Sequence, residues 1–157
     1  MTKSIRIGLI SDTHNLLRPE ARTALKGVDH IIHAGDICGA QVLKELEAIA
    51  PVTAVRGNND RGDWAEGLQE RVRVEFGGIQ VYIVHDLQDL DVLPETAGIK
   101  VVVSGHSHRP LMKMENGVLY VNPGSAGPRR FSLPISIGFL EIAEGRAKGR
   151  LQTLEVD

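Results

Sequence analysis

The stretch that decides the fold is Ile5-Arg-Ile-Gly-Leu-Ile-Ser-Asp-Thr-His14, an apolar run that ends in polar side chains. Its first part, Ile5 to Ile10, is short, rich in isoleucine and interrupted at Arg6 and Gly8, which favours a β-strand. Strand-like and helix-like segments then alternate, and this order favours parallel pairing of the strands. The expected elements are a helix over residues 19–26, a strand over 29–34, a helix over 41–50 and a strand over 52–55.

The rest of the chain is rich in predicted strands. Gly77-Gly78 and Asn116-Gly117 are two-residue hairpin signals. The strands expected around them cover residues 71–76, 79–85, 100–104, 111–114 and 118–121, with two more between Pro134 and Glu155 around Glu144-Gly145. Leu90, Val92 and Leu93 fit a short buried helix. The chain lacks an internal repeat or a linker, so we expect two stacked sheets flanked by helices in a single domain over residues 1–157.

Composition excludes several classes of protein. The chain has 157 residues, 42% of them hydrophobic, and a formal net charge of −2. A near-neutral charge without a Lys/Arg-rich run makes nucleic acid an unlikely partner. Cys38 is the only cysteine, and neither a signal peptide nor a membrane span is evident, so we expect a cytoplasmic protein without a membrane partner. A homo-oligomer remains open.

Five polar clusters share one placement, because each follows the end of a predicted strand. They are Asp12-Thr-His14, Gly35-Asp36, Gly57-Asn58-Asn59-Asp60, His85 and Gly105-His106-Ser-His108. In open α/β sheets the carboxyl ends of the strands face the ligand crevice, so these side chains are expected to meet. The glycines at 35, 57 and 105 allow backbone conformations that other residues resist, so we expect the loops to turn sharply there. Carboxylates, imidazoles and an amide without a thiolate suit Mn, Fe, Zn, Ni or Co. A lone Asp-x-His or His-x-His would be weak evidence; the ordered set is specific.

In this order the clusters resemble the motifs of the calcineurin-like metallophosphoesterases, most closely the small YfcE-like phosphodiesterases. The segment Asn122-Pro-Gly-Ser125, followed by Arg129-Arg130, is also similar to a loop of that subfamily. The resemblance implies a four-layer αββα sandwich of two mixed β-sheets flanked by helices. It further implies a metal-dependent phosphodiesterase acting on a small phosphodiester through a dinuclear centre and a bridging hydroxide.

The resemblance also assigns roles to single residues. Asp12, His14, Asp36 and His108 would hold one metal ion, and Asp36 would bridge to a second ion held by Asn58, His85 and His106. Mn²⁺ is the expected metal, with Fe, Zn, Ni or Mg²⁺ as alternatives. Asp60 would orient groups near the nucleophile. Arg129, Arg130 and Ser125 are candidate substrate contacts, the arginines through bidentate binding of phosphate.

The chemistry of this set is consistent with ester hydrolysis. Two divalent ions, two carboxylates and a hydroxide leave a formal charge of about +1, which attracts an anionic ester. A bound metal can lower the pKa of water from 15.7 to about 7, so no protein nucleophile is required. Relatives place a histidine or cysteine where this chain has Asn59. An amide donates a hydrogen bond but cannot deliver a proton, so part of the roughly 10²–10⁴-fold contribution of general acid catalysis is expected to be lost.

Other residues have simpler interpretations, and other functions stay open. Cys38 is expected to be a small buried residue rather than a reactive thiol, Trp64 to pack in the core or an interface, and His30 and His33 to be structural or surface residues. The alternative to an enzyme is a catalytically weak interaction scaffold on the same fold, similar to the retromer scaffold subunit. Against the scaffold, unpaired buried carboxylates and imidazoles would lower stability without metal. A nuclease ranks lower because a basic groove is missing.

Overall fold

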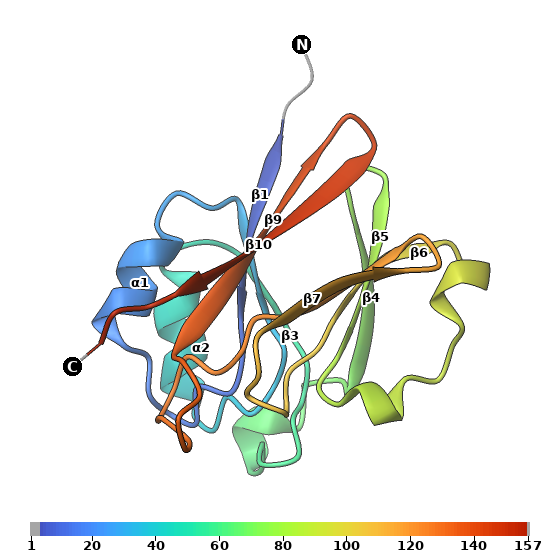
Figure 1. The fold of residues 1–157 in the computed structure, drawn as a ribbon. Helices are drawn as coiled ribbons and strands as arrows, with labels where there is room; N and C mark the ends of the chain where they lie inside the picture. Colours follow the sequence, from blue (N-terminus) through green and yellow to red (C-terminus); the bar gives the residue numbers. More distant parts are fainter. Residues whose placement is uncertain (1–3, 157) are drawn as a thin grey trace.

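Two five-stranded β-sheets pack against each other in the computed structural model, which describes residues 4–156 (Figure 1). The first sheet has the order β10-β9-β1-β2-β3 and the second β4-β5-β6-β8-β7. The strands are β1 (Ile5–Ile10), β2 (His30–His33), β3 (Val52–Ala54), β4 (Arg71–Phe76), β5 (Ile79–Val84), β6 (Ile99–Val103), β7 (Leu111–Glu115), β8 (Val118–Asn122), β9 (Ser136–Ala143) and β10 (Arg146–Thr153).

The strand pairing confirms the prediction from the opening stretch. β1 pairs with β2, and β2 with β3, in parallel, with Leu9 opposite Ile32 in the first pair. The expected hairpins also form: β4 with β5, β7 with β8, and β9 with β10 are antiparallel. In the second sheet β5 pairs with β6, and β6 with β8, in parallel, so both sheets are mixed, as the family resemblance implied.

Three apolar layers stabilise this arrangement. The central layer lies between the sheets and contains Leu9 and Val81. A second layer lies under the helices α1 (Pro19–Leu25) and α2 (Ala40–Glu47), which cover the outer face of the first sheet. The third, including Tyr82 and Val102, lies on the outer face of the second sheet. Burial of apolar surface in these layers is the main force that holds the two sheets together.

One predicted element is wrong. The connection between β5 and β6 contains two 3₁₀ turns, Leu87–Asp89 and Pro94–Thr96, instead of the predicted helix around Leu90, Val92 and Leu93. Leu93 is 66% exposed, whereas Leu90 and Val92 pack on the sheet. Pro94 explains the difference, since the residue before a proline is disfavoured in helical conformation. Across residues 4–156, the longest apolar helix falls short of what crossing a bilayer requires.

The carboxyl ends of five strands bring the polar clusters to one end of the molecule. The loops after β1 and β2 run together, with Asp12 N–H donating to the Gly35 carbonyl at 3.0 Å and His14 N–H to the Asp36 carbonyl at 3.0 Å. In the second sheet, Gly105 N–H donates to the His85 carbonyl at 2.8 Å. The predicted convergence at a sheet edge is thus present.

Candidate metal centre

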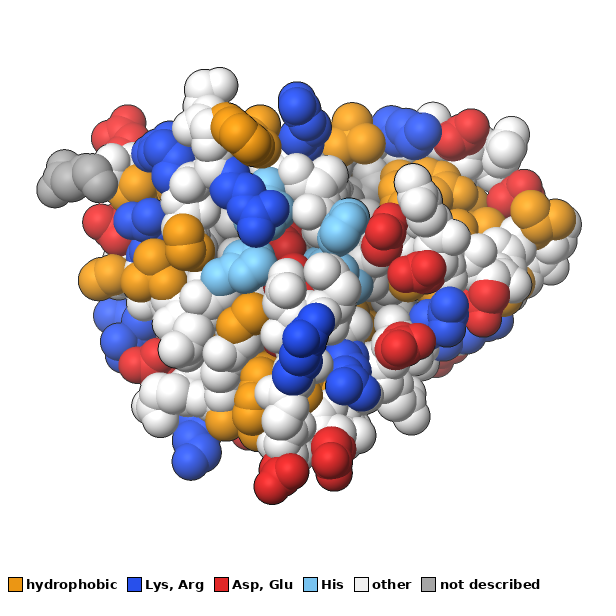
Figure 2. All heavy atoms as spheres, turned by 90° about the horizontal axis from the view of Figure 1, so that it is seen from below, with side chains coloured by type: hydrophobic (Ala, Val, Ile, Leu, Met, Phe, Trp, Pro, Cys, Tyr) orange, Lys and Arg blue, Asp and Glu red, His pale blue; other side chains and the backbone are white. Residues whose placement is uncertain are grey.

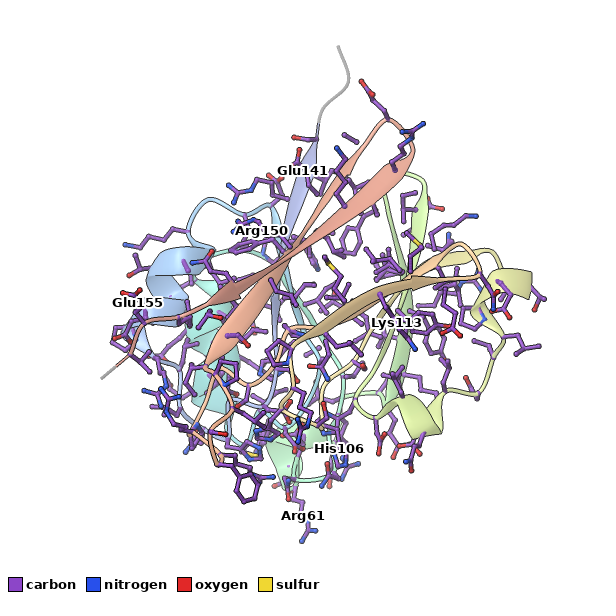
Figure 3. All side chains as sticks on the ribbon, in the orientation of Figure 1. Arg61, His106, Lys113, Glu141, Arg150 and Glu155 are labelled. Atoms are coloured by element: carbon purple, nitrogen blue, oxygen red, sulfur yellow. The ribbon has the colours of Figure 1, made fainter. Side chains whose placement is uncertain are left out.

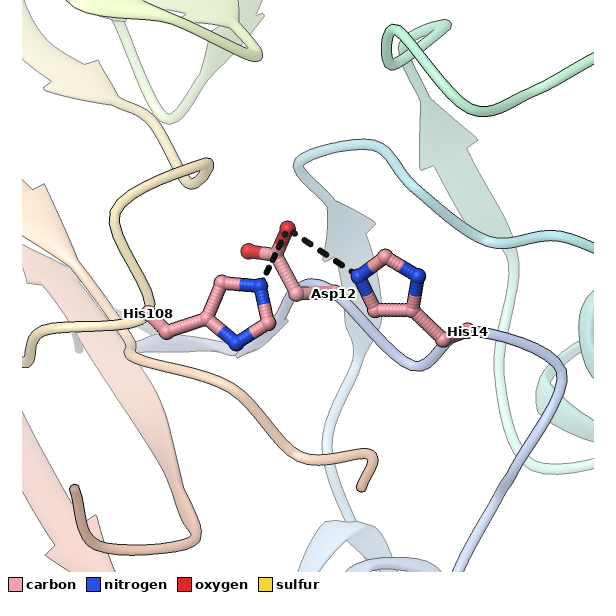
Figure 4. Close-up of side chains that lie close together, drawn as sticks. All are labelled: Asp12, His14 and His108. Atoms are coloured by element: carbon pink, nitrogen blue, oxygen red, sulfur yellow. Dashed lines mark ion pairs between the residues drawn. The ribbon is translucent and has the colours of Figure 1, made fainter. Parts of the chain in front are cut away.

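Asp12 lies at the middle of the centre and is fully buried. Its Oδ2 accepts hydrogen bonds from the Ser11 hydroxyl at 2.7 Å and from His106 N–H at 3.1 Å. Its Oδ1 accepts none and instead lies 3.5 Å from His108 Nε2 and 3.9 Å from His14 Nε2 (Figure 4). One carboxylate oxygen is therefore fixed by the protein and the other is left facing imidazoles.

Two groups of side chains have the geometry of metal ligands. Asp12, His14 and His108 form one group; Asp12, Asp36 and His85 form the other, with the ligand atoms of each group all within 4.8 Å of one another. Buried polar atoms usually have partners, and leaving one without any is destabilising. Here Asp12 Oδ1, His14 Nε2, His85 Nε2 and His108 Nδ1 are all buried without a hydrogen bond. The first three of these atoms belong to a set of oxygen and nitrogen donors that fits divalent cations.

Asp36 lies between the two groups as well. Its Oδ2 is 3.4 Å from His85 Nε2 and 3.7 Å from His14 Nε2. Asn59 holds this carboxylate with two donors, its backbone N–H to Oδ1 and its side-chain amide to Oδ2, both at 2.9 Å. Burial acts to raise the pKa of Asp36, but the His85 ring and the Asn59 donors outweigh it and bring the pKa below its usual range.

The pKa values of the other ligands follow from burial and from these carboxylates. Burial raises the pKa of Asp12, although the His85 and His108 rings oppose the shift. For His85 burial is outweighed by Asp36 and Asp12, so that its pKa is raised. His108 has a lowered pKa, chiefly because of burial. His85 Nδ1 lies 2.7 Å from the Ala34 carbonyl, a contact that places the proton on Nδ1 and leaves Nε2 as an acceptor.

Asp60 binds the loops rather than the open site. It is 1% exposed, and its Oδ2 accepts from the backbone N–H groups of Asp36 at 3.0 Å and Gly57 at 2.8 Å. Its Oδ1 accepts from Cys38 N–H at 2.8 Å. Asp60 thus connects the loops after β2 and β3, which agrees with the orienting role implied by the resemblance.

The backbone of these loops is strained at the ligands themselves. Asp12, His14, Asp36, His106 and His108 all have positive φ, between 45° and 73°. The left-handed region costs a residue with a side chain roughly 1–2 kcal/mol. Strain of this kind concentrates at functional sites, where the surrounding structure enforces it. Sequence patterns contain no direct signal for it.

The neighbouring glycines serve two different purposes. Gly35 has φ +103°, which confirms the predicted sharp turn. Gly57 and Gly105 do not have positive φ; a Cβ at Gly57 would overlap Asp36, and one at Gly105 would overlap Ser11 and Asp12. For these two glycines the expectation of an unusual backbone is wrong, because close approach of the loops is what excludes a side chain.

Asn58 and His106 form the exposed part of the predicted ligand set. The His106 side chain is 47% exposed, its Nε2 lies 3.6 Å from Asp86 Oδ2, and its ring centroid is 5.2 Å from that of His85. Asn58 is exposed. Together with His85 they line a pocket of about 280 Å³, here named the polar pocket, whose wall also includes Arg56, Glu70, Arg71, Asp86 and Asp89.

A second pocket lies on the other side of His106. This apolar pocket, of about 130 Å³, is lined in part by Leu87, Leu111 and Tyr120 and shares Asp86 and His106 with the polar pocket. The space-filling view of this end shows histidines around buried acidic atoms, with charged side chains of both signs at the rim (Figure 2).

The candidate substrate contacts have different placements. Arg129 and Arg130 are exposed; Arg129 Nη1 donates to the Leu133 carbonyl at 3.3 Å, and the charge of Arg130 contributes to the lowered pKa of His108. Ser125 is only 2% exposed and its hydroxyl donates to the Asp12 carbonyl at 3.1 Å. The Ser125 hydroxyl therefore fixes the loop that carries Asp12, in place of the substrate contact that we expected.

His33 and Thr13, to which the sequence analysis assigned no role in the site, hold the loops in place. His33 is fully buried; its Nδ1 accepts from Gly35 N–H at 3.1 Å and its Nε2 lies 3.0 Å from Thr13 Oγ1. Thr13 Oγ1 in turn donates to the Ile37 carbonyl at 3.1 Å. The one sequence feature that could have indicated this role is the position of His33 at the end of β2, just before the Gly35-Asp36 cluster. Burial lowers the pKa of His33 to about 3, so the ring stays neutral.

Cys38 and Trp64 agree with the simpler interpretations in part. Trp64 packs against the layer under the helices. Cys38 is half-buried, with Sγ 3.6 Å from His14 Nδ1. Burial, followed by the nearby carboxylates, raises the pKa of Cys38 to about 11, so it remains a thiol at neutral pH.

With this geometry established, comparisons with known proteins define the class. The sequence profile of the calcineurin-like phosphoesterase superfamily domain matches residues 5–145. The chain belongs to this superfamily. It is 37% identical over 140 residues to a probable metallophosphoesterase of Methanothermobacter thermautotrophicus, a match that covers 82% of this chain and 81% of the relative.

Solved structures agree with the fold. An archaeal phosphodiesterase is 26% identical with a TM-score of 0.77, over 94% of this chain and 100% of that one. Vacuolar protein sorting 29 of Cryptosporidium parvum superimposes with a TM-score of 0.76 at 19% identity, over 98% and 99% of the two chains. The second likeness concerns the fold alone, so both enzymes and sorting proteins share this architecture.

Proposed function

We propose that this protein is a metal-dependent phosphodiesterase that hydrolyses a small phosphodiester at a centre of two divalent ions. The observation that carries the proposal is the set of orphaned buried atoms on Asp12, His14 and His85. Without a cation these atoms have lost their hydration and gained no partner, which costs stability. A cation at each ligand group would satisfy them.

The ligands for each ion follow from the two groups. His14 and His108 with Asp12 would hold one ion; Asp36 and His85, completed by Asn58 and His106, would hold the other. Asp36 is proposed as the bridge, and Asp12 Oδ1 also lies near a histidine of each group, 3.5 Å from His108 Nε2 and 3.9 Å from His85 Nε2. The donor set suits Mn²⁺, which we propose as the metal. When bound, the ions supply Lewis-acid stabilisation of the phosphoryl group and lower the pKa of water.

The protein's own residues then hold and orient this centre. The amide of Asn59 fixes Asp36 through two hydrogen bonds, and Asp60 fixes the backbone on either side. The Asn59 side chain provides no transferable proton, so we propose that the substrate carries a good leaving group. Arg129 and Arg130, exposed on the loop beside Asp12, are proposed to attract the anionic ester.

The interaction scaffold is the second candidate. It rests on the likeness to vacuolar protein sorting 29, which at 19% identity is a likeness of fold. A scaffold has no physical need for orphaned carboxylate and imidazole atoms at its surface cleft. We therefore favour the enzyme, as one domain acting in the cytoplasm, a setting consistent with a single reduced cysteine.

Metal binding and selectivity together test the proposal. Calorimetric titration of the metal-free protein with Mn²⁺ should give two ions per chain. With Mn²⁺ bound, bis(p-nitrophenyl) phosphate should be hydrolysed well above alkyl phosphomonoesters, because a site of about +1 charge without a general acid favours a monoanion with a good leaving group. Two bound ions without turnover would support the scaffold, and equal rates on both substrate classes would contradict the selectivity argument.

A further inference from the structure

The polar pocket opens directly from the exposed side of the metal centre. Asn58, His85 and His106 line both, so any group attached to a phosphoryl held at the centre can extend into this pocket. Its remaining wall comes from Arg56 after β3, from Glu70 and Arg71 at the start of β4, and from Asp86 and Asp89 after β5.

Most of the charges in the polar pocket already have partners. Arg71 Nη1 lies 3.8 Å from Glu70 Oε2, and its Nε donates to the Asp89 carbonyl at 2.8 Å. Asp86 Oδ2 is 3.6 Å from His106 Nε2, and Asp86 Oδ1 accepts from Gln88 N–H at 3.0 Å. These groups shape the wall and offer little unsatisfied charge to a ligand.

Two groups in the same wall are different. Arg56 is half-buried and anchored by Nε, which donates to the Asp60 carbonyl at 3.1 Å, while its guanidinium has no carboxylate partner among residues 4–156. Asp89 uses its backbone in two hydrogen bonds, but its carboxylate is without a partner in the same described range. One free donor group and one free acceptor group of opposite charge thus line a single pocket.

This pairing discriminates between classes of ligand. A second anionic group would meet the Asp89 carboxylate, and a quaternary ammonium would meet the Arg56 guanidinium. An apolar group would remove both charges from water without replacing their hydrogen bonds, which is unfavourable. A neutral polyol can satisfy both, since a hydroxyl donates to a carboxylate and accepts from a guanidinium.

We propose that the polar pocket is a subsite for a hydroxyl-bearing arm of the phosphodiester, such as a glyceryl or sugar group, with Arg56 donating to one hydroxyl and Asp89 accepting from a neighbouring one. This inference rests on the proposed phosphodiesterase function and adds the substrate class. The apolar pocket across His106 is a smaller, separate space that an alkyl or aryl arm fits better.

The experiment uses three diesters that share a p-nitrophenyl leaving group and differ in the second arm: glyceryl, propyl or choline. With Mn²⁺ bound, kcat/KM for the glyceryl diester should exceed that for the propyl diester roughly tenfold, the size expected for hydrogen bonds to charged groups. Arg56→Gln and Asp89→Asn should each remove most of this ratio. Leu111→Ser in the apolar pocket should not lower this ratio, and Arg61→Gln, at an exposed arginine that extends into solvent below His106 (Figure 3), should leave it unchanged.

Binding provides a readout that does not need turnover. Calorimetry on the Mn²⁺-loaded protein should give tighter binding of glyceryl phosphate than of propyl phosphate, with the difference lost in Arg56→Gln. Equal preference for all arms, preference for choline, or loss of the ratio in Leu111→Ser instead would overturn the subsite. Absence of turnover for every diester, with the calorimetric difference intact, would overturn the phosphodiesterase proposal while leaving the subsite standing.

Discussion

The two sides of the metal centre differ in how firmly the protein holds them. Asp12, Asp36, His85 and His108 are at most 5% exposed, and most of them have hydrogen bonds that fix their orientation. His106 is half-exposed and Asn58 is exposed, and both border the polar pocket. The buried side is preorganised for cations, whereas the exposed side is where a substrate can reach them.

The origin of the difference lies in the sheets. The buried ligands follow β1, β2, β5 and β6, which are interior strands of their sheets, and the chain at these points is held by bonds between adjacent loops. Asn58 instead follows β3, the edge strand of its sheet. An edge position reduces the constraints on a side chain.

The largest effect is expected from removing the carboxylate that lies between the two ligand groups. Asp36→Ala should abolish binding of two ions, because its Oδ2 is near histidines of both groups. Loss of metal activation, worth several kcal/mol, should lower kcat/KM by about 10³-fold or more. Metal content by mass spectrometry and turnover of an aryl phosphodiester are the measurements.

A matched control for this variant is Asp63→Ala, at an exposed acidic residue of the 3₁₀ turn Asp63–Ala65. It should keep both ions and the full rate. Retention of two ions and of activity in Asp36→Ala would show that Asp12 bridges the ions alone and that the assignment of Asp36 is mistaken.

The next largest effect compares two proposed ligands of the same ion. His85→Ala should weaken the second ion more than His106→Ala does, because His85 is held by the Ala34 carbonyl and is buried beside two carboxylates. His106→Ala removes a half-exposed ring that pays more conformational entropy on binding. Calorimetric affinities for Mn²⁺ in the two variants measure the difference, and equal losses would mean that burial does not preorganise this ion's site.

The sequence predicted the parallel strands at the start of the chain, the hairpins and the meeting of the clusters, because these follow from the hydrophobic pattern and from the order of the elements. Alternating strands and helices over residues 5–55 require parallel neighbours, and parallel strands deliver the residues after them to one edge. Asp12 and Asp36 could thus be placed together although 24 positions separate them in the sequence.

The features that could not be predicted from the sequence depend on contacts between loops in the folded protein. The close packing that requires Gly57 and Gly105, and the bond from the Ser125 hydroxyl to Asp12, depend on contacts between loops distant in the chain. The same holds for His33, whose two ring nitrogens connect separate loops. No local pattern distinguishes such a residue from an ordinary strand histidine, and the polar pocket arises only when three loops meet.

Substitution of His33 removes hydrogen bonds that hold the buried ligands in place, without changing a proposed ligand. His33→Asn keeps an acceptor for Gly35 N–H, and His33→Gln keeps a donor to Thr13. Each should weaken Mn²⁺ binding by roughly 10–100-fold, the range for groups that orient ligands, and His33→Ala by more. If the Asn and Gln variants bind Mn²⁺ more tightly than the Ala variant, the hydrogen bonds of His33 position the ligands. Equal affinities in all three variants would show that His33 contributes only by packing.

The same residue predicts a pH dependence of stability. Its pKa is about 3 in the folded chain against 6.5 unfolded, so its contribution is present above pH 6.5 and is lost as the pH falls toward 3. The loss is about 1.36 kcal/mol per pH unit, or roughly 2 kcal/mol between pH 6.5 and 5. Urea unfolding of the metal-free protein should show this loss in the wild type and not in His33→Gln. His30→Gln, at the half-exposed start of β2, should retain most of it.

The smallest effect is expected at Asn59, where two consequences of one substitution oppose each other. Asn59→His would place a proton donor beside the centre, and general acid catalysis is worth roughly 10²–10⁴-fold with poor leaving groups. The substitution also removes the side-chain hydrogen bond to Asp36, and a bond to a charged group is worth about 1.5–3 kcal/mol, or roughly 10–100-fold. The net gain on alkyl diesters should therefore be about tenfold, and it should disappear at high pH as the imidazole loses its proton. Activated aryl esters need no acid, so for them only the loss of the Asp36 bond remains and their rate should fall. With metal content unchanged, a uniform change across all leaving groups would show that residue 59 acts only by holding Asp36. Asn59, although exposed, would then belong with the residues that orient the buried ligands.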